Sequence, residues 1–415
     1  MKKINILLAL ILLLFINASC DSFNDAFDTK EIAPLSVNVN AIMSIEGVNS
    51  SEGLKVKFDN YSENIHLEKV LGKSTTLVEG LLPGIYSINI TGKVTTSSGD
   101  EYYVNGSKIN YAITKEGEVL DVSINGLKIS PLIFSEIFYA GTATFYFRNQ
   151  FYEIYNNSSK TIYLDGIYFA NLTPSTATTK LPKWPDADGA NYAYAERVWK
   201  FPGSGTDYPV KPGESVVISQ FAANHKLAQY NPNSPVDCSS SEFEFNMNNK
   251  NFPDQPAVDM THVFYNGKSV LGSVPQYLTS VMGGAYIIFK VPEGEAWDPV
   301  NNTSLSTRDL SGTSTTLYAK VPIKYVLDGV ECGQNETMIA AKRVPSVLDA
   351  GMTYVGATYN SLGVARYKIG ENEDGTPILM DTNNSTDDFE RGVIPTFRRY
   401  GSKMPSWNHT LKGNN

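Results

Sequence analysis

Cysteine is scarce in this chain, which narrows its chemistry. Only 3 of the 415 residues are Cys, and neither Cys238 nor Cys332 has another Cys or a His at the spacing of a metal site. An oxidising compartment would permit a disulfide between these two residues, so a bridge and two buried free thiols both stay open. The sequence predicts no metal centre and no cofactor.

Catalytic motifs are also lacking. The chain contains no G-x-S-x-G elbow, H-E-x-x-H pair or P-loop, and its 4 His residues are isolated from one another. We therefore expect a protein that is not an enzyme and that has no catalytic residues.

Positive charge is not concentrated in any run of Lys and Arg. Together with a net charge of −9, this excludes the basic footprint that nucleic-acid binding requires, so no nucleic-acid partner is expected. The composition is 42% apolar, 11% aromatic and only 19% charged. This balance is typical of secreted β-sandwiches, and the length leaves enough core for two domains.

The first twenty residues predict the location of the protein. Lys2 and Lys3 precede a short apolar run, residues 6–16, and Ala18-Ser19-Cys20 follows it. This pattern indicates a signal peptide over residues 1–19. The junction resembles the lipobox of bacterial lipoproteins, which implies diacylation of Cys20 and a lipidated tether over residues 20–33. The alternative is ordinary secretion, with Cys20 in the discarded peptide.

Three acidic residues follow the junction, namely Asp21, Asp25 and Asp28. They resemble the export signal that sends Bacteroidota lipoproteins to the outer face of the membrane, although an acidic tether would look the same. We expect an outer-membrane protein that is lipid-anchored and displayed at the cell surface.

A first domain is expected over residues 34–130. Leu35–Val39 and Leu54–Phe58 alternate apolar and polar residues with period two, as half-buried strands do. Pro83-Gly84 makes a turn before a third alternating segment, Tyr86–Ile90. The last two features resemble a strand of carboxypeptidase-regulatory-like and transthyretin-like modules, which implies an Ig-like or transthyretin-like β-sandwich.

A second domain is expected over residues 131–401, followed by a tail, residues 402–415. Phe151–Tyr155, Thr161–Leu164 and Ile167–Phe169 read as three strands joined by short turns, and we expect them to form a β-meander.

Several segments of this second domain resemble the lamin-tail domain, which is an immunoglobulin-like β-sandwich. The matching residues are Phe134–Ile137, Gln150–Asn156, Leu164–Gly166, Val210–Ile218 and Asp381–Phe389. The predicted fold class is therefore all-β, with two β-sandwich domains. The second domain is lamin-tail-like and carries long insertions.

The insertions are expected at residues 173–208, 221–283 and 293–317, because a lamin-tail domain needs far fewer residues. They are rich in large aromatic residues, namely Trp184, Trp199, Trp297, Tyr192, Tyr194, Tyr208 and Tyr230. These aromatic side chains either pack the loops onto the sandwich or form a recognition surface for a partner. The tryptophans are the candidate partner-binding residues.

The segment that begins at Asp381 alternates oxygen-bearing side chains as calcium ligands can. However, Thr386 and Gly392 stand where an EF-hand needs Gly and Glu. Calcium binding and a solvated turn rich in Asp and Asn are the two alternatives.

The whole chain resembles a family of Bacteroidota lipoproteins that pair an N-terminal sandwich with a lamin-tail-like domain. The resemblance implies an accessory or binding role, with nutrient capture or docking on a TonB-dependent barrel transporter of the outer membrane. An adhesin or envelope-structural protein is the second hypothesis. A hydrolase is the third, because lamin-tail modules accompany some nucleases and phosphatases.

The anchoring prediction can be tested at Cys20. Cys20→Ala should release the protein from the membrane fraction or leave its precursor unprocessed, because the acyl chains that hold it are attached through this thiol. Fractionation followed by immunoblotting measures the outcome. A variant that is processed and stays membrane-bound like the wild type would contradict lipidation.

Overall fold

The computed structural model describes residues 32–408 apart from residues 49, 61, 74, 179 and 186–190. The predicted signal peptide, Cys20, Asp21, Asp25 and Asp28 lie outside the described residues. The described residues form two compact units: one comprises the residues up to Gly92 with Val104–Asn125, and the other comprises Lys93–Tyr103 with the residues from Gly126 onward. Across the part of the chain that is described, no helix is long and apolar enough to cross a membrane.

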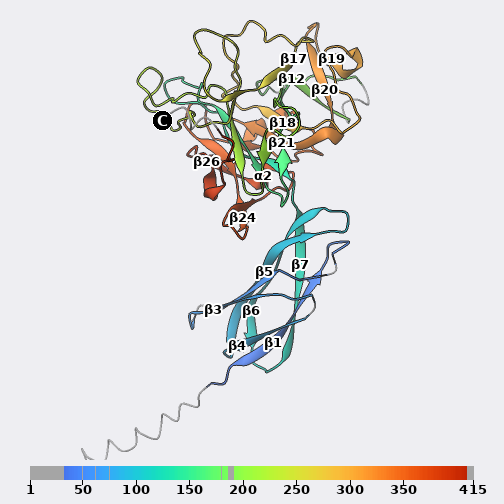
Figure 1. The fold of residues 1–415 in the computed structure, drawn as a ribbon, viewed down its shortest axis with the longest axis vertical. Coiled ribbons are helices and arrows are strands. Elements are labelled where there is room, and N and C mark those ends of the chain that lie inside the picture. Colours follow the sequence, from blue (N-terminus) through green and yellow to red (C-terminus); the bar gives the residue numbers. More distant parts are fainter. Residues whose placement is uncertain are drawn as a thin grey trace, which may run out of the picture. The chain divides into compact units, whose positions relative to one another are not determined.

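The first unit is built on seven strands in the order β3-β2-β5-β6-β7-β1-β4 (Figure 1). Their bounds are β1 (Leu35–Met43), β2 (Lys55–Asn60), β3 (Ile65–Val70), β4 (Thr76–Leu81), β5 (Gly84–Thr95), β6 (Glu101–Ile113) and β7 (Glu118–Lys128). On β5, Tyr86, Ile88 and Ile90 are buried while the residues between them are not, which confirms the predicted period-two strand.

The second unit contains two large sheets. One has the order β16-β15-β14-β9-β8-β23-β26. Its strands are β8 (Leu132–Phe138), β9 (Phe151–Asn156), β14 (Ser215–Ser219), β15 (Phe243–Glu244), β16 (Val258–Asp259), β23 (Gly363–Arg366) and β26 (Phe389–Val393). We call it the first sheet of the unit.

The second sheet has the order β19-β20-β12-β11-β18-β21-β22, and β17 also pairs with β12. Its strands are β11 (Tyr168–Leu172), β12 (Tyr192–Lys200), β17 (Thr261–Tyr265), β18 (Ala285–Phe289), β19 (Ser306–Arg308), β20 (Leu317–Pro322), β21 (Val326–Gly333) and β22 (Thr353–Tyr354).

Two small strand pairs and several short helices complete the unit. They are β10 (Ile162–Tyr163) with β13 (Pro209–Val210), β24 (Lys368–Glu371) with β25 (Pro377–Leu379), α2 (Ser385–Asp388), η2 (Thr303–Leu305), η3 (Ile323–Tyr325), η4 (Glu336–Ala341) and η5 (Arg399–Gly401).

The two large sheets pack face to face around an aromatic core. Tyr152 on β9 lies 4.8 Å from the ring centroid of Phe169 on β11 and 4.7 Å from that of Tyr286 on β18. All three side chains are fully buried. Because these rings come from both sheets, they confirm the predicted all-β sandwich architecture.

The expected β-meander is wrong. β9 belongs to the first sheet, β10 pairs with β13, and β11 belongs to the second sheet. The Asn156 side chain helps to separate them, because its amide nitrogen donates to the carbonyl oxygens of Lys160 at 2.7 Å and Val210 at 2.8 Å. These bonds hold the chain in a turn that leads away from β9.

The second sheet is buried on both faces, which corrects the interpretation of two tryptophans. Trp199 lies on β12, inside the sheet, and is fully buried against Phe245. Trp297 packs on the other face of the sheet, where its indole nitrogen donates to the carbonyl oxygen of Lys320 at 2.8 Å. Neither side chain is placed to contact a partner. The segment expected as an insertion over residues 173–208 in fact supplies a strand of the sandwich.

Cys238 and Cys332 are both free and buried, so the disulfide alternative is not supported. They belong to separate clusters, since Cys332 lies between the sheets and Cys238 packs with Phe138 and Phe151 on the outer face of the first sheet.

Arg366 on β23 is buried at the centre of an ion network. Its guanidinium lies 3.0 Å from the carboxylate of Asp328 on β21, and 3.1 Å from those of Asp381 and Asp388. Its Nε also donates to the carbonyl oxygen of Phe134 at 2.8 Å. Asp381 is thus committed to the guanidinium, whereas Asn383, Thr386 and Asp387 of the same segment are exposed. Calcium binding and a solvated turn both stay open for this segment.

This network predicts a large loss of stability on removal of the cation. Arg366→Met would leave three buried carboxylates without their partner, so the free energy of unfolding should fall by about 3–5 kcal/mol. Urea denaturation followed by circular dichroism measures the change. Arg308→Met, at an exposed arginine of β19, is the matched control and should change stability by less than about 0.5 kcal/mol. Equal effects of the two substitutions would contradict a stabilising network.

Candidate ligand-binding site

A recess of about 740 Å³ opens in the second unit. Most of its lining comes from two of the segments expected as insertions, and the rest from the loop after β8 and from Asn171 on β11. Seven of the lining side chains are aromatic, namely Phe145, Tyr146, Phe147, Tyr230, Phe252, Tyr265 and Tyr277. The remaining lining is largely polar, and a volume of this size is typical of small-molecule sites.

Arg197 on β12 is the most buried charge in the wall, with only 4% of its surface exposed. Its guanidinium carbon lies 3.9 Å from the ring centroid of Tyr265 and 5.6 Å from that of Tyr277. Its Nη1 donates to the carbonyl oxygen of Leu271 at 2.8 Å and contacts Nε2 of His262 at 3.2 Å. β12 and β17 place Arg197 directly opposite Tyr265 in the sheet, so the stacked pair is fixed by strand register.

His262 is held neutral beside this cation. Burial lowers its pKa to about 4, and its Nδ1 lies 2.7 Å from the carbonyl oxygen of Ser269. Because a carbonyl can only accept, Nδ1 carries the proton and Nε2 is left to accept from Arg197. The imidazole therefore orients the guanidinium without adding charge.

Two further charges line the recess. The guanidinium carbon of Arg148 lies 4.3 Å from the ring centroid of Phe252. Glu196, adjacent to Arg197 in sequence, accepts a hydrogen bond from the backbone N–H of Ser175 at 3.2 Å. With two guanidinium groups and one carboxylate, the lining carries a formal charge of +1 in a chain whose net charge is −9.

Gln276 is the polar group in the wall that has no partner. Its side chain is 6% exposed, and neither its amide nitrogen nor its amide oxygen makes a hydrogen bond to the described residues. Buried polar side chains are satisfied in the large majority of cases, and leaving one unpaired costs about 1–3 kcal/mol. Both amide atoms are also shielded from solvent, so they do not offer a donor or an acceptor to the open recess.

Tyr146 is positioned from behind by His225. Nε2 of His225 contacts the carbonyl oxygen of Phe221 at 2.9 Å, so this nitrogen carries the proton and Nδ1 accepts from the Tyr146 hydroxyl. Burial lowers the pKa of His225 to about 4 and raises the pKa of Tyr146. The pair is neutral at neutral pH.

The three tryptophans do not meet at this recess. Trp184 lines a separate hollow of about 320 Å³, where it stacks on Tyr194 with ring centroids 3.8 Å apart. Of the aromatic residues expected at a recognition surface, Tyr230 lines the recess. Arg197, Arg148 and Gln276 were not among the site residues expected from the sequence. Arg197 and Gln276 lie within segments that were expected as aromatic-rich insertions, and this location was the signal in the sequence that could have pointed to them.

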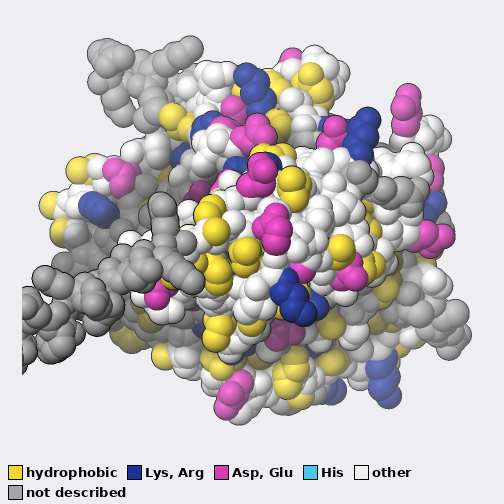
Figure 2. Space-filling model, turned by 90° about the horizontal axis from the view of Figure 1, so that it is seen from below, with side chains coloured by type: hydrophobic (Ala, Val, Ile, Leu, Met, Phe, Trp, Pro, Cys, Tyr) yellow, Lys and Arg dark blue, Asp and Glu magenta, His cyan; other side chains and the backbone are white. Residues whose placement is uncertain are grey.

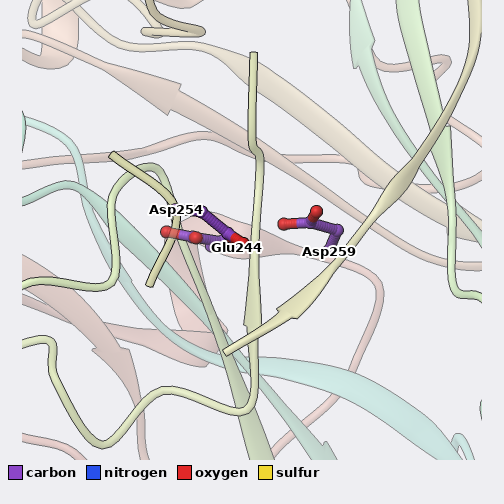
Figure 3. Close-up of side chains that lie close together, drawn as sticks. All are labelled: Glu244, Asp254 and Asp259. Atoms are coloured by element: carbon purple, nitrogen blue, oxygen red, sulfur yellow. The ribbon is translucent and has the colours of Figure 1, made fainter. Parts of the chain in front are cut away.

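A cluster of carboxylates lies near the edge of the first sheet. Oxygen atoms of Glu244, Asp254 and Asp259 lie within 4.8 Å of one another (Figure 3). Burial raises the pKa of Glu244 to about 7. Each of the two oxygens of Glu244 accepts a backbone N–H at 2.9 Å, from Ala222 and from Gln255. Because these bonds occupy Glu244, we assign the cluster a role in holding its loops.

Comparison with known proteins places the chain in a family. A family model described as "Protein of unknown function (DUF4876)" matches residues 211–396. The crystal structure of a DUF4876 family protein from Bacteroides thetaiotaomicron is similar to this chain, with 60% sequence identity. The match covers 91% of this chain and 100% of that chain, with a TM-score of 0.72. The chain belongs to the DUF4876 family.

Membership in DUF4876 confirms the expected family of unknown function with a Bacteroides member. No curated protein matches the chain. Within the region that the DUF4876 model matches, the recess draws on Phe252, Tyr265 and Gln276. Lipidation and the lamin-tail resemblance stay predictions.

His225 predicts a pH dependence of stability. The unfolded residue binds a proton near pH 6.5, whereas the folded one does so only near pH 4. The stability that depends on neutral His225 is therefore present above pH 6.5 and is lost as the pH falls toward 4. Between pH 7 and pH 5 this loss should be about 2 kcal/mol.

His225→Gln should remove that loss. Urea denaturation of wild type and variant at both pH values isolates it, since the other titrating groups, such as Glu244, contribute equally to both proteins. Lys226→Gln, at the exposed neighbour, should keep the wild-type pH dependence. The same pH dependence in wild type and His225→Gln would contradict a buried neutral histidine.

Proposed function

We propose that this DUF4876 protein is a non-enzymatic lipoprotein of the outer membrane that captures a small organic ligand at the cell surface. It acts as an accessory component beside a barrel transporter of the TonB-dependent kind. Cys20 is the proposed anchor, and Asp21, Asp25 and Asp28 are the proposed surface-export signal.

The recess is the observation that carries this proposal. Its volume of about 740 Å³ suits a molecule of drug or nutrient size, and its wall combines aromatic rings with polar and charged groups. Adhesion to a matrix or to another protein instead uses a broad surface of roughly 800 Å² on each partner. A recess of this volume with aromatic residues in its wall favours capture of a small molecule.

The chemistry around the recess supports binding in preference to catalysis. His225 and His262 are the histidines next to it, and both ring nitrogens of each are engaged in contacts that keep the ring neutral. A general base must be free to reach a substrate proton. Charges of both signs are scattered over the face of the molecule shown in Figure 2, which suits a protein without a nucleic-acid partner.

Blocking the recess tests the proposal. Val274 lines it and is 42% exposed, so Val274→Trp should fill the opening without disturbing the core. Val270 is 61% exposed and does not line the recess, so Val270→Trp is the matched control. Each protein is incubated with a small-molecule extract of the growth medium and dialysed. The molecules released on denaturation are then identified by mass spectrometry.

We expect wild type and Val270→Trp to retain the same molecule and Val274→Trp to lose it. Retention of nothing by wild type, or equal retention by Val274→Trp, would overturn the assignment of the recess as the binding site.

A further inference from the structure

We propose that the recess selects an organic anion, namely a small molecule that carries a carboxylate on a ring. The inference rests on the proposed function, because it takes the recess to be the ligand-binding site and adds the chemical class of its ligand.

Three arginines of the second unit have buried side chains, and they differ in whether a carboxylate compensates their charge. Arg366 is bonded to three aspartates, and the guanidinium of Arg343 lies 2.7 Å from the carboxylate of Glu331. Arg197 is 4% exposed, yet it makes no ion pair with any carboxylate of the described residues. A buried guanidinium is costly unless an anion compensates its charge. Arg343 lines the smaller hollow beside Trp184, but its charge is already compensated by Glu331. Arg197 lines the recess of about 740 Å³ without a carboxylate partner, so an anion that enters this recess meets an uncompensated charge.

The charged side chains that line the recess are positive on balance. Arg148 also lines the recess without an ion pair to a described carboxylate, so two guanidinium groups are available and Glu196 opposes only one of them. A planar guanidinium binds a carboxylate through two parallel N–H donors, which makes Arg better suited than Lys to this recognition.

The shape of the wall indicates the shape of the ligand apart from its carboxylate. The stacked faces of Arg197 on Tyr265 and of Arg148 on Phe252 form flat walls, and Tyr277 adds a further buried ring. Flat walls of this kind favour a ring-shaped molecule.

Aromatic acids and acidic sugars share this chemistry, and matched probes distinguish them. The aromatic pair is 2-naphthoate and 2-acetylnaphthalene, in which a methyl ketone replaces the carboxylate. The sugar pair is galacturonate and galactose. Binding of all four to the full protein is measured by calorimetry and by saturation-transfer NMR.

At least one acid should bind about tenfold more tightly than its neutral counterpart, as charge-assisted hydrogen bonds predict. The acid that binds identifies the source class. Arg148→Met and Arg197→Met should each weaken that acid about tenfold and change its neutral counterpart by less than about twofold. Arg308→Met, outside the recess, should change neither.

Arg148→Met is the decisive variant if Arg197→Met disturbs folding, because Arg148 is only half-buried and packs on a single ring. Equal binding of an acid and its neutral counterpart would overturn the selection of anions while leaving the recess as a binding site. If neither acid binds at 10 mM, the proposed ligand class is wrong. The retention experiment with Val274→Trp tests independently whether the recess is the binding site.

Discussion

The ion network of Arg366 holds the two sheets of the second unit in register. Arg366 and Phe134 belong to strands of the first sheet, whereas Asp328 belongs to β21 of the second. Asp328 also accepts the backbone N–H of Phe134 at 2.7 Å, so one carboxylate joins a side chain and a main chain across the sandwich. Burial raises the pKa of Asp388, and the positive charge of Arg366 opposes that shift. A sandwich of many short strands needs such a fixed point, because most of its other contacts are apolar and without direction.

The fixed sandwich allows the recess to be built on strands as well as on loops. Arg197 and Tyr265 face each other across paired strands, and Asn171 reaches the same wall from β11. Loop residues such as Phe252 and Gln276 then close the recess around this platform. Sites supported by strands keep their geometry better than sites made of loops only, which suits selective binding.

Local patterns predicted the parts of the fold that depend on local chemistry. The alternation of Tyr86–Ile90 gave the correct strand because one face of β5 is buried and the other is not. Alternation could not predict β18, because all five of its residues are buried in a sheet that is covered on both faces. The order of β9, β10 and β11 could not be predicted from their turns, since pairing partners such as Val210 lie far away in sequence. Trp199 looked like an interface residue for a similar reason, because the sequence does not show that its segment pairs inside the sheet.

The candidate site could not be predicted from the sequence, because it depends on which groups contact each buried arginine in the folded chain. Arg366 and Arg197 are both arginines on strands, and no local pattern separates them. They differ in the groups that contact them in the folded protein. Arg366 contacts three carboxylates, whereas Arg197 contacts aromatic rings, a carbonyl oxygen and a neutral imidazole. A folded protein satisfies its buried polar groups wherever stability is the only requirement. Arg197 has hydrogen-bond partners but no carboxylate partner among the described residues, and it lines the recess. A buried charge without a counter-ion is costly, and departures of this kind concentrate where a fold gives up stability for function. The uncompensated charge of Arg197, more than the abundant aromatic residues, therefore locates the site.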